Sequence, residues 1–412
     1  MNEEFPYSLA VSPLHDEAAV ARLVAGLAPA LAAAGGEASP PEAAPRDRPL
    51  VHVVLTGGTE RIVLARIEAR AAAGGREPVV LVAHPGHNSL PACLELLARV
   101  RADGGTGRIV FLAGEDGDAA RLGEVVHLAG VALALRRARI GALGEPSEWL
   151  VASAHGAEAV AATWGPELVP LPLSEITSRL PAEGVDAEGE VALIGAARAS
   201  AVAASEVARA GAVHAALADL VAAHRLSAVT VRCFDLVAGS RTTGCLALSR
   251  LADDGVPAGC EGDVPSAVAL LWIQLLTGEA AWMANPARIA PERGELLLAH
   301  CTVPRRLVTA FDLTTHFESD LGVALAGDLA PGPVTLVRLG GRRLERIWLA
   351  EGELTASPHE PGLCRTQAQV TTNPEALAEL LRDPLGNHVV LLPGHRAAQL
   401  GASRDLILAE PA

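Results

Sequence analysis

Short apolar runs alternate with amphipathic segments through the first third of the chain. The β-branched run Leu50–Leu55 ends in the Thr56–Thr59 turn, and a helical pattern then continues to Ala73. The same order of strand, turn and helix recurs, with further strands predicted at Pro78–Ala83, Arg108–Leu112 and Arg139–Leu143. Strands separated by helical segments of about 10–15 residues indicate βαβ units and a parallel sheet.

The pattern starts again and then changes in the second half. Trp149–Ala152 is predicted to begin a second α/β unit, in which a helix over 197–224 leads into a strand at Ala228–Arg232. Beyond Asn285 helical patterns are rare, and Gly/Pro turns separate short apolar runs. The predicted strands there are Leu296–Cys301, Val334–Leu339, Arg346–Leu349, Gln369–Thr372 and Val389–Leu392. Such spacing is typical of a barrel or sandwich.

Three domains follow from these patterns. We expect an α/β fold with Rossmann-like parallel-sheet domains at 1–140 and 141–285, followed by a β-rich, barrel-type domain at 286–412. A chain of 412 residues is consistent with this division, since domains commonly have about 100–200 residues.

Composition excludes several classes of function. The chain has no lysine, so all 33 basic residues are arginine, which excludes Schiff-base lysine chemistry and a P-loop. The formal charge of −15 argues against nucleic-acid binding, which needs a basic surface.

No apolar run is long enough to span a membrane. The N-terminus is acidic where a signal peptide is basic, and the six cysteines form no CxxC pair. We therefore expect buried thiols and a reducing, cytoplasmic location.

Polar side chains at the ends of predicted strands are the candidates for chemistry, because ligands bind beyond the carboxyl ends of parallel strands. The Thr56–Thr59 turn resembles a phosphate loop only weakly. Asp235 comes soon after the strand at Ala228–Arg232, and Glu261 and Asp263 stand two residues apart in Cys260-Glu261-Gly262-Asp263. In an extended segment their side chains would point the same way. Three neighbouring carboxylates are costly unless a cation neutralises them.

Imidazoles that could complete a metal site follow later in the chain. A hard divalent ion such as Mg²⁺ or Mn²⁺ prefers carboxylate oxygens, with imidazole as a further ligand. The candidate histidines lie near predicted strand ends or in adjoining turns: His300, His316, His388 and His395.

Several segments carry a resemblance to a known family. VRCFDL, TTGCLALS, GVPAGCEGDVPSAVALL and MANP, followed by AHCTVP, THFES and GNHVVLLPGH, resemble the L-fucose isomerase-like proteins, relatives of L-fucose and L-arabinose isomerases. HPGHNSLPA and GEPSEWLVAS in the first half fit the same pattern. The resemblance implies a metal-dependent aldose–ketose isomerase, usually with Mn²⁺, that assembles as a homo-oligomer, a trimer or hexamer, with active sites near subunit boundaries.

The resemblance also implies roles for residues. In fucose isomerases a Glu, an Asp and a His hold the metal; the Asp corresponds to Asp263 and the His to His388. The third ligand stays open between Asp235 and Glu261. Arabinose isomerases have Met-Glu-Asp where this chain has Met283-Ala284-Asn285, which argues against that specificity.

The expected mechanism is proton transfer through an enediol, with Asp235 and Asp263 as metal ligands and acid–base groups and Glu261 as a third ligand or partner. The predicted sugar contacts are Arg232, His300, His316, Glu318, Asn387 and His395. Two alternatives stay open. In the first, the substrate is a sulfonated or phosphorylated sugar, bound by Arg232, Arg241, Arg396 or the Thr56–Thr59 turn. In the second, the protein is a non-catalytic sugar-binding protein without a metal.

Overall fold

The computed structural model describes residues 4–74, 77–181 and 188–408. The chain divides into two compact units, one of residues 1–136 and 399–412 and the other of residues 137–398. Each unit is described by itself.

Unit 1 is built on a five-stranded parallel sheet in the order β2-β1-β3-β4-β5. Its strands are β1 Phe5–Ala10, β2 Gly36–Ala38, β3 Val51–Val54, β4 Val79–Ala83 and β5 Gly107–Phe111. Its helices are α1 Glu17–Ala33, α2 Glu60–Ala72, α3 Ser89–Ala102, α4 Asp118–Arg137 and α13 Ala397–Ile407. Every residue of β3 and β4 is buried, as expected for parallel strands covered on both faces.

Unit 2 begins with a four-stranded parallel sheet in the order β7-β6-β8-β9. Its strands are β6 Arg139–Leu143, β7 Glu167–Leu171, β8 Ala228–Val231 and β9 Ala258–Cys260. The helices of this part are α5 Ala157–Thr163, α6 Ser174–Thr177, η1 Glu188–Glu190, α7 Val191–Ala196, α8 Ala204–His224, α9 Cys233–Ser240, α10 Cys245–Asp253 and α11 Val264–Thr277.

A closed antiparallel barrel follows in unit 2, in the strand order β10-β11-β16-β15-β14-β17. Its strands are β10 Trp282–Ala290, β11 Glu295–His300, β14 Gly332–Gly340, β15 Arg346–Ala356, β16 Thr366–Thr372 and β17 Val389–Pro393. The remaining elements are the hairpin β12 Val308–Thr314 and β13 Ala324–Leu329, the helix α12 Pro374–Arg382, and the short turns η2 Pro291–Arg293 and η3 Arg305–Leu307. Closure removes exposed sheet edges.

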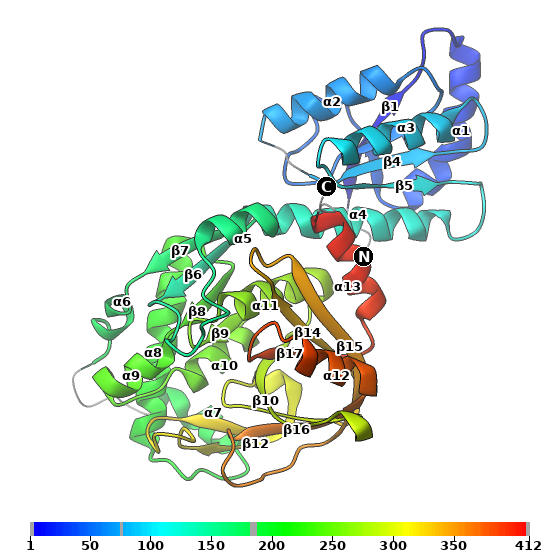
Figure 1. The fold of residues 1–412 in the computed structure, drawn as a ribbon. Coiled ribbons are helices and arrows are strands. Elements are labelled where there is room, and N and C mark those ends of the chain that lie inside the picture. Colours follow the sequence, from blue (N-terminus) through cyan, green and yellow to red (C-terminus); the bar gives the residue numbers. More distant parts are fainter. Residues whose placement is uncertain (1–3, 75–76, 182–187, 409–412) are drawn as a thin grey trace. The chain divides into compact units, whose positions relative to one another are not determined.

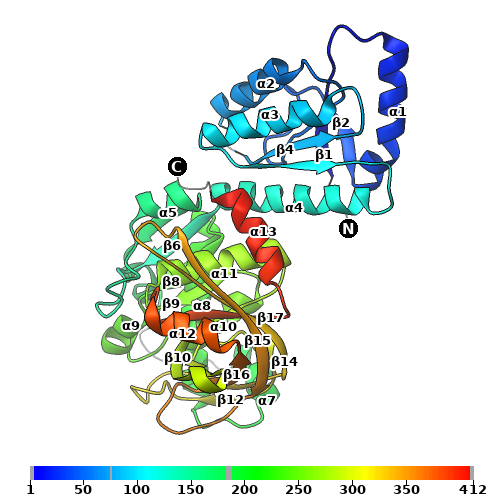
Figure 2. The ribbon, with the colours of Figure 1, turned by 45° about the vertical axis from the view of Figure 1, so that its right-hand side comes forward.

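Helix α11 joins the two parts of unit 2. It contacts β6, β8 and β9 of the parallel sheet as well as β10, β14 and β17 of the barrel, and Figures 1 and 2 show it between them. Its sequence is apolar almost throughout, and most of its side chains are buried, as expected for a helix covered on all sides. Asp263 caps its N-terminus and Gly278 ends it in the left-handed conformation. The segment just before α11 is therefore held between sheet and barrel.

The structure confirms parallel-sheet α/β regions followed by a closed β-barrel. It differs from the sequence analysis in the helix expected over 197–224, which begins only at Ala204. The backbone N–H groups of Arg198 and Ala201 instead bond to carbonyls of β12, so this segment is held by the hairpin. Among the described residues, no helix is long and apolar enough to cross a membrane.

Candidate metal centre

The parallel sheet of unit 2 presents the carboxyl ends of β6, β8 and β9 at one edge. Residues just beyond these ends bond to one another: the Arg232 N–H donates to the Leu143 carbonyl (2.9 Å) and the Ser147 N–H to the Glu261 carbonyl (2.9 Å). Glu261 directly follows β9. It therefore lies where a parallel sheet binds ligands.

The Cys260-Glu261-Gly262-Asp263 segment is a tight turn. Glu261 has φ +61° and Gly262 has φ +73°, and a Cβ at Gly262 would lie 2.8 Å from Pro146 Cα, so only glycine fits there. We expected this segment to be extended, and the structure shows that it is not. In consequence, Glu261 and Asp263 face different nitrogens of His388: Glu261 Oε1 lies 3.6 Å from Nε2, and Asp263 Oδ2 lies 2.7 Å from Nδ1.

The barrel supplies two histidines from strands on either side of β10. In the register of these strands, Asn285 of β10 pairs with Ala299 of β11, and Ala284 pairs with Val389 of β17. His300 ends β11 and His388 immediately precedes β17. Two imidazoles far apart in the sequence therefore meet at one end of the barrel, with their ring centroids 5.5 Å apart.

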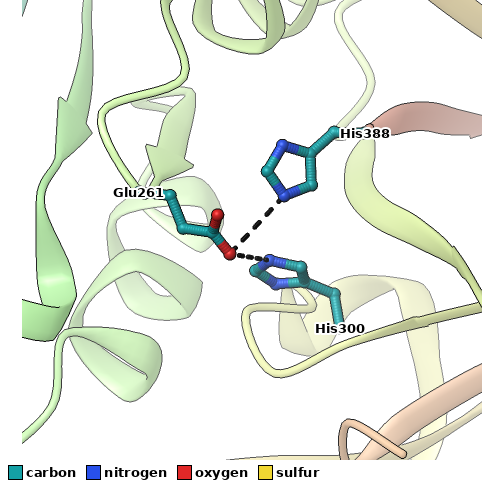
Figure 3. A group of neighbouring side chains, drawn as sticks. All are labelled: Glu261, His300 and His388. Atoms are coloured by element: carbon teal, nitrogen blue, oxygen red, sulfur yellow. Dashed lines mark ion pairs between the residues drawn. The ribbon is translucent and has the colours of Figure 1, made fainter. Parts of the chain in front are cut away.

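Glu261, His300 and His388 form one group of potential ligands (Figure 3). Glu261 Oε1 lies 3.8 Å from His300 Nε2 and 3.6 Å from His388 Nε2. One ligand atom from each of the three buried residues lies within 4.8 Å of the others. Two imidazoles and one carboxylate are thus aimed at a common point.

The surroundings of His388 turn one nitrogen, Nδ1, toward Asp263 and the other, Nε2, toward Glu261. Its Nδ1–H donates to Asp263 Oδ2 (2.7 Å), because an ionised carboxylate only accepts. Its Nε2 is buried and finds no hydrogen-bond partner among the residues that the structure describes; Glu261 Oε1 lies 3.6 Å from it. Burial lowers the pKa of His388, but the neighbouring carboxylates of Asp263 and Glu261 outweigh this and raise the pKa to about 9. His300 is oriented similarly, with Nδ1 2.9 Å from Thr302 Oγ1.

Asp263 supports this group from behind. It is fully buried; its Oδ1 accepts the Ser266 N–H (2.7 Å) at the start of α11, and its Oδ2 accepts both His388 and Arg338 Nη1 (3.0 Å). Burial raises the pKa of Asp263, yet the Arg338 charge and the His388 hydrogen bond bring it well below its usual range. We expected Asp263 to be a ligand and an acid–base group. In the structure both its oxygens are engaged, and it positions His388.

Glu261 is the carboxylate nearest the imidazoles. Burial raises its pKa, but the hydrogen bonds and charges of His300 and His388 lower it by more. The net pKa therefore lies well below its usual range. Its Oε2 accepts the Trp149 Nε1–H at 2.6 Å. The remaining oxygen, Oε1, is the one that faces both histidines (Figure 3).

The residues fit a divalent metal ion. Ligands bind Zn²⁺-like ions at about 2.0–2.2 Å, so the three atoms need only close slightly around an ion. A carboxylate behind a ligating imidazole, as Asp263 stands behind His388, is the usual outer support of such a site. Two histidines and one carboxylate leave further positions on the ion open. The observation that most favours a metal here is that the buried His388 Nε2 has no hydrogen-bond partner among the described residues.

Asp235, the other expected ligand, lies outside this group. It is in the first turn of α9, its side chain is half exposed, and its Oδ2 lies 2.9 Å from Arg232 Nε. Arg232 also binds Glu148 and donates to the Pro146 carbonyl. Arg232 thus fixes the loop that follows β6, together with Asp235.

The other predicted contacts are spread more widely. His316 is buried, with its ring 5.4 Å from that of Phe234 and its Nδ1 3.1 Å from Ser319 Oγ. Glu318 and Asn387 are exposed. His395 is exposed and bonds to the Gly352 carbonyl of β15 (3.2 Å). Of the six predicted sugar contacts, the structure brings His300 into the ligand group.

In the turn between β3 and α2 of unit 1, the threonine hydroxyls bond to backbone groups of the protein. Thr56 Oγ1 accepts the Ser12 N–H and Thr59 Oγ1 donates to the Thr56 carbonyl. His84 is buried, with its Nε2 2.9 Å from the Leu55 carbonyl. These contacts give the Thr56–Thr59 turn a structural role.

Two important residues were missed by the sequence analysis. Arg338 has a signal in the sequence, because it is the one charged residue in the apolar run Val334–Leu339 and a charge in a buried strand needs a partner. Trp149 has no such signal, since its contact with Glu261 is made by a turn 112 residues away.

No family model matches the chain, and a search of curated proteins finds no match to it.

Proposed function

We propose that this protein is a metal-dependent isomerase that interconverts an aldose and a ketose through an enediol. The observation that carries the proposal is the convergence of Glu261, His300 and His388, in which the buried His388 Nε2 has no hydrogen-bond partner among the described residues. The resemblance of the CEGD, AHCTVP and GNHVVLLPGH segments to L-fucose isomerase-like proteins supports it, and so does a fold of parallel-sheet α/β regions followed by a closed barrel. By that resemblance the ion is Mn²⁺.

The reaction moves one proton from C2 of the aldose to C1 of the ketose and one hydroxyl proton from O2 to O1. A divalent ion bound at this site supplies positive charge that stabilises the developing enediolate oxygens. Glu261, His300 and His388 would hold it. Asp263 keeps the proton of His388 on Nδ1, so that Nε2 is the ligating atom.

Proton transfer at carbon needs a general base that can reach the substrate, and we consider the predicted carboxylates for this role. Asp263 is excluded from this step by its complete burial and its two engaged oxygens. Asp235 is half exposed and held by Arg232, and it follows Phe234, whose ring contacts Trp149 beside Glu261. We therefore assign the proton transfer to Asp235, with Glu261 as the ligand.

The anionic-sugar alternative finds less support at this site. Arg232 is paired with Glu148 and Asp235, and Arg396 with Glu279. Arg241 lines a cavity of about 570 Å³ together with Arg209, Glu206 and Thr315; Glu261, His300 and His388 are not among the residues that line it.

The direct test is isomerisation in D₂O. Protein loaded with Mn²⁺ is incubated with a panel of neutral aldoses and their ketoses, and carbon-bound deuterium is followed by NMR. We expect deuterium at C1 of the ketose and C2 of the aldose for one substrate, and loss of this exchange in Asp235→Asn. A panel in which sugars bind but none is converted to its isomer would contradict isomerisation and favour a sugar-binding protein.

A further inference from the structure

Trp149 is a half-exposed tryptophan in the turn that follows β6, and it contacts the candidate metal centre. Its side chain is 49% exposed, unlike Trp164, Trp272 and Trp282, which are fully buried. Its Nε1–H donates to Glu261 Oε2 at 2.6 Å. An indole N–H is a donor only, so this bond requires Oε2 to act as an acceptor.

The backbone holds the indole against Glu261 from several directions. The Ser147 N–H donates to the Glu261 carbonyl and the Leu150 N–H to the Ser147 carbonyl, each at 2.9 Å. The Trp149 ring also meets the Phe234 ring edge-on, with centroids 4.9 Å apart. These backbone hydrogen bonds and the ring contact therefore fix the position of the indole relative to the Glu261 carboxylate.

In this arrangement the two Glu261 oxygens have different partners. Oε2 is committed to the indole, whereas Oε1 faces His300 Nε2 and His388 Nε2 at 3.8 and 3.6 Å. A free carboxylate can bind a metal through both oxygens. A strong hydrogen bond to the second oxygen disfavours that mode, because it occupies one of the two lone-pair sites of that oxygen and holds the carboxylate in one orientation.

We propose that Trp149 is a positioning residue that restricts Glu261 to one-oxygen metal binding and so keeps a coordination position open for substrate. The inference rests on the metal site of the proposed function. It adds the residue that sets the number of open positions, which the three ligands alone do not fix.

Co²⁺ is a suitable probe, since its visible absorption weakens as its coordination number rises. Metal-free protein is titrated with Co²⁺ in three forms: wild type, Trp149→Phe and Trp348→Phe. Trp149→Phe keeps an aromatic ring against Phe234 but deletes the N–H. Trp348→Phe is the matched control, because it deletes an indole N–H bond to the Ala376 carbonyl (3.0 Å) elsewhere in unit 2.

We expect Trp149→Phe to bind Co²⁺ with weaker visible absorption, as Glu261 becomes a two-oxygen ligand, and with about tenfold lower affinity, as is usual when an outer support of a metal site is lost. Trp348→Phe should match wild type. Indistinguishable spectra for wild type and Trp149→Phe would overturn the inference alone. A wild-type protein that binds no Co²⁺ would overturn the proposed metal site, and this inference with it.

A second measurement does not depend on the variant folding like wild type. Co²⁺ quenches a nearby indole, so we expect titration of wild type to quench its tryptophan fluorescence, and Trp348→Phe to show the same quenching. Wild-type protein that binds Co²⁺ without quenching would place Trp149 away from the ion and contradict the proposal.

Discussion

Asp263 is a fully buried carboxylate whose oxygens serve an arginine, a histidine and the start of a helix at once. Such a charge is tolerated because Arg338, also fully buried, lies 3.0 Å away. Arg338 donates in turn to Ser266 and Ser153. The three residues Asp263, Arg338 and His388 are therefore interdependent, and a change at one affects the others.

Asp263→Asn tests this interdependence. Asparagine still caps α11, but it leaves Arg338 as an uncompensated buried charge, which costs about 3–5 kcal/mol. We expect urea unfolding to show a loss of that size, and Mn²⁺ affinity to fall about 10- to 100-fold because His388 loses its anionic partner.

The control is Asp254→Asn, which removes an exposed carboxylate that contacts His214. It should change stability by less than about 1 kcal/mol. Equal effects of the two substitutions would contradict the supporting role assigned to Asp263.

At the scale of elements, strand β3 contains a histidine that must stay neutral for the strand to remain buried. His52 is 2% exposed; burial first, and then the charges of Arg66 and Arg70, lower its pKa to about 3. Its partner is the Ser8 hydroxyl of β1, 3.4 Å from Nδ1. Protonating it would place an unpaired charge inside the sheet.

The folded pKa of His52 is below its unfolded value of about 6.5, so the unfolded chain takes up the proton first as pH falls. Stability is unaffected above that value and is lost as pH falls toward 3. At about 1.4 kcal/mol per pH unit, His52 should cost about 2 kcal/mol at pH 5. Urea unfolding of wild type and His52→Gln at pH 7 and pH 5 measures this. A pH dependence shared by both would refute it.

The strands were the elements that the sequence predicted best. β6 has the predicted bounds, and β3, β4, β8, β11 and β17 are within a residue or two at each end, because buried strands form uninterrupted apolar runs. β1 was not predicted. Its buried residues are interrupted by partly exposed ones, so it forms no uninterrupted apolar run.

The candidate site was predictable in its residue types more than in its geometry. Glu261 and His388 were identified because acids and histidines recur at strand ends. The left-handed backbone at Glu261 and Gly262 turns Asp263 away from the position of a ligand, and nothing in the local pattern shows which of two neighbouring carboxylates faces the barrel. His300 joined the group through the register of β10 and β11, which depends on barrel closure.

At the scale of the whole molecule, all three candidate ligands belong to unit 2. A ligand that binds only the native state stabilises it by mass action, by about 2.7 kcal/mol at a concentration 100 times its Kd. A metal held between the parallel sheet and the barrel should therefore stabilise unit 2 directly. Unit 1 contributes no ligand to this group.

Hydrogen exchange with and without Mn²⁺ can locate that stabilisation. We expect slower exchange in β9, α11, β11 and β17, and unchanged exchange in β3 and β4 of unit 1. Chelation with EDTA should reverse the effect. Protection spread equally over both units would contradict a site confined to unit 2.

The most direct test of the metal centre is elemental analysis of protein exposed to Mn²⁺ and freed of unbound ions, for wild type, His388→Ala and His395→Ala. His395 is the matched control, an exposed histidine bonded to the Gly352 carbonyl. We expect a single bound ion per chain in wild type and His395→Ala, and its loss in His388→Ala, whose fold circular dichroism would verify. A wild-type protein that retains no divalent metal, or a folded His388→Ala variant that retains it fully, would contradict the proposed site.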